Sequence, residues 1–180
     1  MNIIKRKLNI LKKRKIDKKI NNFFSWIKGA ELVELKTCNI TDDPVRPELD
    51  VIFRTSYGRK IFGVKYKKEI CAIMCFGFTD EVPSTVKELD LMTRDAYLKS
   101  AQRDQNIGNI AIAYTIWSKK RGGGKLIVKE IFKKIKKSNH LNRLVTLSPL
   151  TEMASKFHTR NGAKLVKVNE TTQNFEYKVM

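Results

Sequence analysis

The most informative part of the chain reads Tyr114-Thr-Ile-Trp-Ser-Lys-Lys-Arg121-Gly122-Gly123-Gly124-Lys125-Leu-Ile-Val-Lys-Glu-Ile-Phe-Lys-Lys-Ile135. An apolar run that favours β-structure stops at a basic turn with three glycines, and a helical pattern begins at once. Apolar residues then recur at a spacing of three to four, as on the buried face of an amphipathic helix. The stretch therefore predicts a strand, a glycine turn and a helix in immediate succession.

The glycine turn has the features of an anion site. Glycines let an anion approach the backbone closely, and the first N–H groups of a helix have no partner inside it. The helix dipole adds partial positive charge at the same end. Full charges come from Lys119, Lys120, Arg121 and Lys125. We therefore expect a phosphate here, and the alternative is a plain turn with a basic, solvated face.

Two common nucleotide-binding patterns do not fit the turn. A P-loop needs a hydroxyl residue directly after its Gly-Lys pair, and Leu126 stands at that position. The dinucleotide fingerprint needs a third glycine, and Ile127 and Val128 occupy that part of the chain. The phosphate predicted here belongs to another kind of ligand.

Length and composition favour one globular domain. The chain has 180 residues, of which 42% are hydrophobic, and no apolar run reaches the roughly 18 residues of a membrane span. The N-terminus has no apolar core typical of a secretion signal. Cys38, Cys71 and Cys75 lack C-x-x-C spacing, and with two histidines they do not predict a zinc site. We expect a cytoplasmic protein with reduced thiols and no metal.

The net charge of +19 indicates a polyanionic partner. Residues 1–20 hold nine Lys or Arg and one Asp, and residues 1–28 have the spacing of a basic amphipathic helical segment. Such a segment either packs on the domain or contacts a nucleic acid or an anionic membrane surface. The alternative source of the charge is a lysine-rich composition.

The rest of the chain alternates between strand and helix patterns. The predicted strands are 31–37, 51–55 at an edge, 60–66, 69–78, 110–117, 143–148, 163–168 and 174–179. The predicted helices are a short one that Ser84 caps and that runs to residue 94, then 124–137 and 151–160. This order predicts an α/β fold for residues 29–180: a mixed, mostly antiparallel sheet flanked by helices.

This order and these residues resemble the GNAT superfamily of coenzyme A-dependent acyltransferases, from about residue 61 to residue 179. Arg121-Gly122-Gly123-Gly124 fits the Arg-x-x-Gly part of the loop that wraps the coenzyme A pyrophosphate in that family. Leu126 departs from the small residue with which the family's motif ends. The tail Ala154-Ser-Lys-Phe157-His158-Thr-Arg-Asn161-Gly162-Ala163 is similar to the family's closing helix and turn.

The resemblance implies that acetyl-CoA or another acyl-CoA is the cofactor. Ile116 and Trp117 would lie along its pantetheine arm. Its pyrophosphate would be held by Arg121, Gly122, Gly123, Gly124 and Lys125. An amine acceptor, on a small molecule, a protein or a nucleic acid, would attack the thioester.

A second, local resemblance concerns malonyl-CoA decarboxylases, which contain a GNAT-like domain. Their Leu-Ser-Pro and Phe-His-x-x-Asn-Gly-Ala segments match Leu147-Ser148-Pro149 and the segment from Phe157 to Ala163. This resemblance implies a catalytic His158 with Ser148. Tyr114 belongs to the strand that the GNAT resemblance assigns to the cofactor, and it would line the acceptor cleft. The alternatives are a His158 that caps local carbonyls, a Ser148 that caps the next helix, and a Tyr114 in the core or on the surface.

Three functions follow from the residues and the resemblances together. The first is an acyltransferase that moves an acyl group from acyl-CoA to an amine. The second is a basic nucleic-acid-binding module without catalysis. The third is an enzyme similar to malonyl-CoA decarboxylase, which would need no acceptor.

Overall fold

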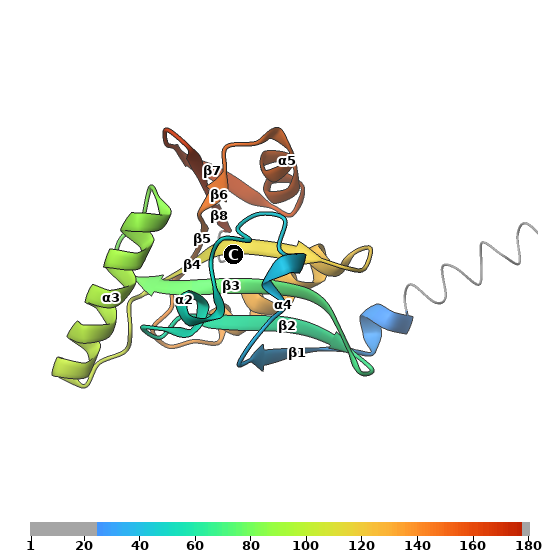
Figure 1. The fold of residues 1–180 in the computed structure, drawn as a ribbon, viewed down its shortest axis with the longest axis horizontal. Helices are drawn as coiled ribbons and strands as arrows, with labels where there is room; N and C mark the ends of the chain where they lie inside the picture. Colours follow the sequence, from blue (N-terminus) through green and yellow to red (C-terminus); the bar gives the residue numbers. More distant parts are fainter. Residues whose placement is uncertain (1–24, 178–180) are drawn as a thin grey trace, which may run out of the picture.

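The computed structural model describes residues 25–177, and these residues form one eight-stranded sheet (Figure 1). The strand order is β1-β2-β3-β4-β5-β8-β6, with β7 paired to β8, and β4 and β5 are the parallel pair in an otherwise antiparallel sheet. The strands are β1 (Ala30–Leu35), β2 (Lys60–Tyr66), β3 (Glu69–Thr79), β4 (Ile110–Ser118), β5 (Arg143–Thr146), β6 (Ser148–Pro149), β7 (Ala163–Val168) and β8 (Thr172–Tyr177). The predicted α/β class with a mixed sheet is confirmed.

Helices cover both faces of this sheet and give it two cores. They are α2 (Val51–Thr55), α3 (Val86–Arg103), α4 (Gly123–Lys136) and α5 (Glu152–Arg160), with a short 3-10 helix η1 (Ile40–Asp42). The apolar side of α4 packs with Phe62 and Phe76 on one face. Leu89 of α3 and Phe53 of α2 pack with Ile112 and neighbouring residues on the other. None of the helices within residues 25–177 is long and apolar enough to cross a membrane.

Strand β4 contains an irregularity that opens the middle of the sheet. Cys75 lies opposite Thr115 and Phe76 lies opposite Ala113, so Tyr114 is an extra residue against β3. The parallel pairing with β5 ends at Ala113 and Thr146. Beyond this point, which we call the fork, β4 continues to Ser118 while the other strand turns away.

Most predicted elements are confirmed, including the 60–78 hairpin, the strand from 110 and the helices after Gly122 and Thr151. Residues 51–55 are a helix, so the prediction of an edge strand is wrong. Asp50 caps this helix by accepting a hydrogen bond from the Phe53 N–H at 2.6 Å. Helix α3 is longer than predicted, because it runs to Arg103, and Thr85 caps it instead of Ser84. Residues 1–24 of the predicted basic segment lie outside the described residues.

Candidate functional site

The glycine turn connects β4 to α4, and its geometry requires glycine. Gly122 precedes the helix with a left-handed φ of 84°. A Cβ at Gly123 would lie 2.5 Å from the Ser118 Oγ, so a larger residue would force this hydroxyl to move. Among the described residues, none accepts a hydrogen bond from the backbone N–H of Gly122, Gly124 or Lys125. The turn therefore presents free donors at a helix N-terminus, as the sequence predicted.

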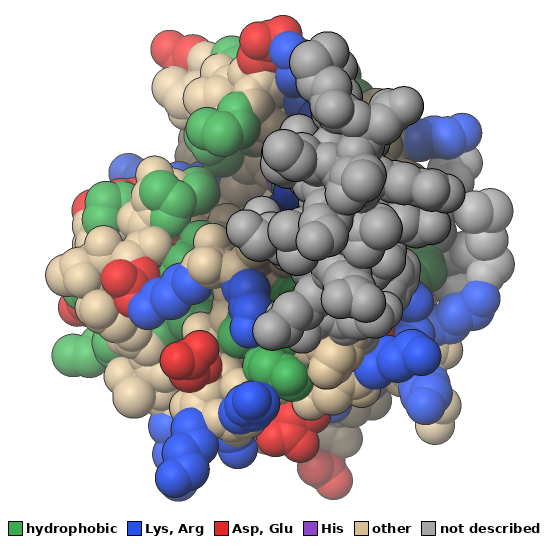
Figure 2. Space-filling model, turned by 90° about the vertical axis from the view of Figure 1, so that its right-hand side faces the viewer, with side chains coloured by type: hydrophobic (Ala, Val, Ile, Leu, Met, Phe, Trp, Pro, Cys, Tyr) green, Lys and Arg blue, Asp and Glu red, His purple; other side chains and the backbone are tan. Residues whose placement is uncertain are grey.

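Four basic side chains surround the turn, but only two of them remain available. Lys119 pairs with Asp42 at 2.5 Å. Lys120 folds back over the Tyr66 ring, with its Nζ 4.7 Å from the ring centre. Arg121 and Lys125 are exposed and have no ionic partner within residues 25–177. Lys and Arg side chains are spread over this end of the molecule (Figure 2).

Leu126, which departs from the family's motif, does not obstruct the turn. Its side chain is 9% exposed and packs in the core cluster beneath α4. Its N–H is bonded to the Gly122 carbonyl at 3.0 Å, inside the first helical turn. The departure therefore changes the core side of the helix and leaves the free donors of the turn accessible.

The fork between β4 and β5 holds the guanidinium of Arg46. Its Nε donates to the Tyr114 carbonyl at 2.9 Å and its Nη2 to the Leu147 carbonyl at 3.1 Å, so one side chain joins both strands. Arg46 is 9% exposed, and burial lowers its pKa from the usual value. Its third nitrogen, Nη1, has no acceptor among the described residues. A cation with a free donor therefore lies where the two strands separate.

A buried ion pair holds the segment that carries Arg46. We call residues 43–54 the strap. Arg54 Nη2 and Asp43 Oδ2 are 2.9 Å apart, and both side chains are fully buried. The Thr115 hydroxyl also donates to this carboxylate at 2.8 Å, which anchors the strap to β4. The strap thus has a fixed position over the fork.

A second buried set of hydrogen-bonded side chains consists of Ser148, His158 and Tyr177. The His158 Nε2 lies 2.8 Å from the Ser148 Oγ, and its Nδ1 lies 2.9 Å from the Tyr177 hydroxyl. The Ser148 hydroxyl donates to the Thr146 Oγ1 at 2.9 Å. Burial lowers the pKa of His158 to about 4 and raises that of Tyr177. A neutral imidazole has one donor and one acceptor, so the chain of bonds runs in a single direction.

The structure decides between the alternatives for Ser148 and His158. Both nitrogens of His158 bond to side-chain hydroxyls, so the interpretation of a histidine that caps local carbonyls is wrong. The interpretation of Ser148 as a helix cap is wrong as well. Thr151 caps α5 by accepting from the Ala154 N–H, and Ser148 instead pairs in β6. The two residues are thus adjacent, ten positions apart in sequence.

The remaining predicted residues lie on β4 at and beyond the fork. Tyr114 is 1% exposed and packs edge-on against Phe53, in the core opposite the one that contains Tyr177. The structure therefore does not bring Tyr114 together with His158. The Tyr114 hydroxyl and the Trp117 Nε1 are buried without a hydrogen-bond partner within the described residues. Ile116 is partly buried on the α4 side.

Sequence reasoning missed several residues of these sites: Arg46, Asp43, Arg54, Thr146 and Tyr177. Arg46 and Asp43 belong to a stretch for which the sequence predicted neither a helix nor a strand. The charges of these two residues beside prolines were the one sign in the sequence that they could be site residues. A charged side chain that becomes buried needs a hydrogen-bond or ionic partner. Within residues 25–177, no three His, Cys, Asp or Glu side chains are grouped to hold a metal ion.

Comparison with known proteins supports the fold. No protein-family model matches the chain, and a search of curated proteins finds no match. Among solved structures, the GNAT-like decarboxylase GphF in complex with isobutyryl-CoA superposes with a TM-score of 0.63 at 7% identity, over 82% of this chain and 98% of that one. A Bacillus subtilis acetyltransferase in complex with CoA superposes with a TM-score of 0.57 at 10% identity, over 84% of this chain and 99% of that one.

Malonyl-CoA decarboxylase from Cupriavidus metallidurans gives a TM-score of 0.50 at 18% identity, over 81% of this chain. The match spans 38% of the length of that decarboxylase. At these identities the similarity concerns the fold. The chain has the fold of the GNAT superfamily, as the sequence predicted.

Proposed function

We propose that this chain binds acyl-CoA and transfers its acyl group to an amine. The observation that carries the proposal is the glycine turn, with three free backbone N–H groups beside Arg121 and Lys125. Their positive field suits the pyrophosphate of coenzyme A. The edge of β4 beyond the fork, at Ile116 and Trp117, would receive the pantetheine arm. Proteins with this fold in complex with CoA or isobutyryl-CoA support acyl-CoA binding in general.

The reaction itself would form a C–N bond and break the C–S bond of the thioester. The amine loses a proton and the departing thiolate gains one. His158 is neutral at pH 7, so it can accept a proton at one nitrogen while it gives one up at the other. We propose that Ser148, His158 and Tyr177 carry this proton through their chain of hydrogen bonds.

Calorimetric titration with coenzyme A tests the cofactor assignment. We expect saturable binding to the unmodified protein and at least ~10-fold weaker binding to Arg121→Glu, because that change reverses a charge beside the pyrophosphate. Arg103→Glu makes the same charge change on an exposed residue at the end of α3 and serves as the matched control. Absence of binding at millimolar coenzyme A, or equal weakening in both variants, would reject the proposal.

A second candidate is the decarboxylation of a carboxylated acyl-CoA such as malonyl-CoA. The specific observation is Arg46, whose free Nη1 at the fork could receive a carboxylate. In this reaction the C–C bond to the carboxylate breaks, CO₂ leaves, and the resulting enolate takes up a proton. Release of acetyl-CoA and CO₂ from malonyl-CoA without an amine would favour this candidate. A strict requirement for an amine would exclude it.

A nucleic acid as acceptor or partner is a third proposal, and it rests on net charge. The net charge is +19, and nine of the Lys and Arg residues fall within residues 1–20, which lie outside the described part of the chain. A basic surface would raise the local concentration of a polyanionic acceptor. This proposal is compatible with acyl transfer, since the acceptor amine could belong to a base.

A further inference from the structure

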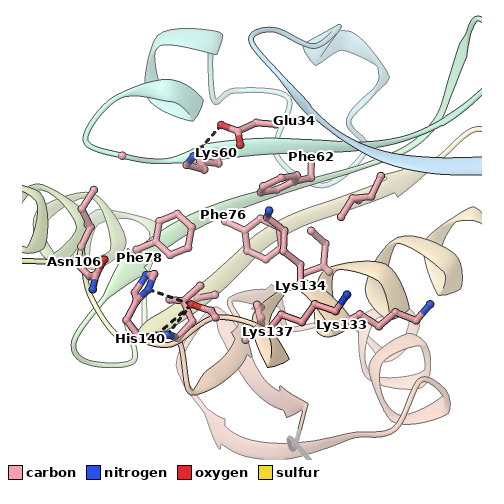
Figure 3. A pocket seen from close by; sticks show the side chains of 18 of the residues that line it. Glu34, Lys60, Phe62, Phe76, Phe78, Asn106, Lys133, Lys134, Lys137 and His140 are labelled. Carbon is pink, nitrogen blue, oxygen red and sulfur yellow. Dashed lines mark hydrogen bonds and ion pairs between the residues drawn. The ribbon is translucent and has the colours of Figure 1, made fainter.

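A cavity of about 830 Å³ lies far from the glycine turn, between the C-terminal half of α4 and the sheet (Figure 3). This volume falls within the ~300–1,000 Å³ typical of small-molecule sites. Lining residues of α4 extend from Glu130 onward. Lys134 follows Lys125 by nine residues, so at ~1.5 Å per residue the cavity is about 14 Å along the helix from the turn. The cavity is therefore separate from the proposed coenzyme A site.

The floor of the cavity is aromatic and aliphatic. Phe62 of β2 and Phe76 of β3 meet edge to face, with ring centres 5.9 Å apart, and Phe78 continues the row along β3. Ile131 of α4 closes the helix side, and Ala111 of β4 contributes the smallest side chain of the wall. Phe62 and Phe76 are only 5% and 2% exposed, so the apolar surface that a ligand could bury lies on the half-buried lining residues Phe78, Ile107 and Leu141.

The rim of the cavity is basic. Lys60 is neutralised by Glu34 at 2.9 Å and Lys133 by Glu130 at 2.8 Å. The Lys134 Nζ lies 5.5 Å from the centre of the Phe62 ring and has no acidic partner among the described residues. Figure 3 shows Lys134 beside the aromatic floor, so a positive charge lies next to apolar surface.

The apolar lining of the cavity and the unpaired ammonium of Lys134 together favour a ligand with an apolar chain and an anionic end. We propose that this cavity binds a free long-chain fatty acid, with its alkyl chain on Phe78, Ile107 and Leu141 and its carboxylate on Lys134. A carboxylate pairs with the ammonium at short range, and the alkyl chain gains burial against the half-buried apolar side chains of the cavity. The chain's own basic segment is a poor occupant, because its nine Lys and Arg in residues 1–20 would be repelled by the same rim.

The test is a fluorescence titration of the full chain with cis-parinaric acid below its micellar concentration, followed by displacement with oleate or with oleyl alcohol. We expect saturable binding and displacement by oleate at least ~10-fold more effective than by the alcohol, because only oleate carries the charge. Lys134→Gln should reduce this preference, although Lys137, which also lines the cavity, keeps part of the positive charge. Lys129→Gln, an exposed lysine of the same helix that does not line the cavity, should retain it.

Three outcomes would overturn the proposal. The first is the absence of saturable binding, which is also the result expected if a part of the chain fills the cavity. The second is equal displacement by oleate and oleyl alcohol. The third is equal loss of preference in the Lys134→Gln and Lys129→Gln variants. None of these results depends on coenzyme A, so they leave the proposed acyl transfer unaffected.

Discussion

His158 is a histidine whose surroundings favour its neutral form. Its ring stacks on Phe175 with centres 5.1 Å apart, and hydroxyl groups occupy both nitrogens. Hydroxyls can accommodate either tautomer, since each can donate or accept. Movement of a proton along the hydrogen bonds of Ser148, His158 and Tyr177 would therefore reverse the direction of these bonds. No buried charge would remain before or after the transfer.

The neutral state of His158 makes stability depend on pH. Its pKa is about 4 in the folded protein, against the usual 6.5 when unfolded. Between these values the unfolded chain binds a proton that the folded chain does not, so stability falls as pH decreases from 6.5 to 4. From pH 7 to pH 5 this residue alone should cost about 2 kcal/mol. Urea unfolding of the unmodified protein and of His158→Gln at both pH values measures the difference.

The Gln variant retains a polar side chain but has no proton to gain in this range. Its stability should therefore change less between pH 7 and pH 5 than that of the unmodified protein. If both proteins lose the same free energy of unfolding, His158 is not the titrating group, and its neutral role in the proton chain loses its support.

Leu126 is the residue at which the glycine turn departs from the motif of the GNAT superfamily. Because the side chain packs in the core, Leu126→Ala should destabilise the fold by ~2–5 kcal/mol through the cavity that it leaves. The affinity for coenzyme A should stay within about twofold, since the free N–H groups of the turn are untouched. Thermal unfolding and calorimetry on the same samples separate the two effects. A large loss of affinity with little loss of stability would place the side chain at the ligand instead.

At the level of elements, the strap depends on a single buried ion pair. Arg54→Met leaves the Asp43 carboxylate without its cationic partner, and breaking a buried pair costs ~3–5 kcal/mol. In a domain of this size we expect the melting temperature to fall by about 10 °C. Adding Asp43→Asn removes the uncompensated charge, so the double variant should recover part of the loss. Destabilisation equal to the sum of the single variants would show that the two residues are not coupled.

The strap is also where prediction from sequence failed. Val51-Ile52-Phe53 is a short run of β-branched and aromatic residues, which favours a strand, and nothing nearby in sequence reveals the partner of Arg54. The helix forms because Asp50 caps it and because Asp43 and Leu49 accept hydrogen bonds from the Arg54 guanidinium. The elements from β4 to α5 were predictable since their patterns are local: long apolar runs, glycine stops and clear helical periods.

The residues of the candidate site also differ in how far the sequence could predict them. The glycine turn and the Ser148–His158 pair could be predicted, because each lies within a short, recognisable segment. Arg46 and Tyr177 could not. Arg46 reaches carbonyls 68 and 101 positions away, and Tyr177 lies 19 positions from His158, so only the assembled sheet brings them together. Long-range contacts of this kind leave no periodic signal in the chain.

For the whole molecule, the remaining question is where its positive charge acts. If nucleic acid is a partner, binding to a short duplex should weaken steeply with salt, by ~10²-fold or more between 50 and 200 mM, because each neutralised phosphate releases counterions. Fluorescence anisotropy measures this dependence directly. A variant with five glutamines in the basic segment should flatten the slope if that segment makes the contacts: Lys5, Lys7, Lys12, Lys13 and Lys15.

The matched control changes the same number of charges on exposed residues of the domain: Lys36, Lys68, Lys87, Lys129 and Lys164. A slope that flattens only in the N-terminal variant would assign the phosphate contacts to residues 1–20. Equal flattening in both variants would mean that the contacts are spread over the whole surface, as a lysine-rich composition alone predicts. A duplex affinity that is weak and insensitive to salt would remove nucleic acid from the candidate acceptors and leave a small amine or a protein.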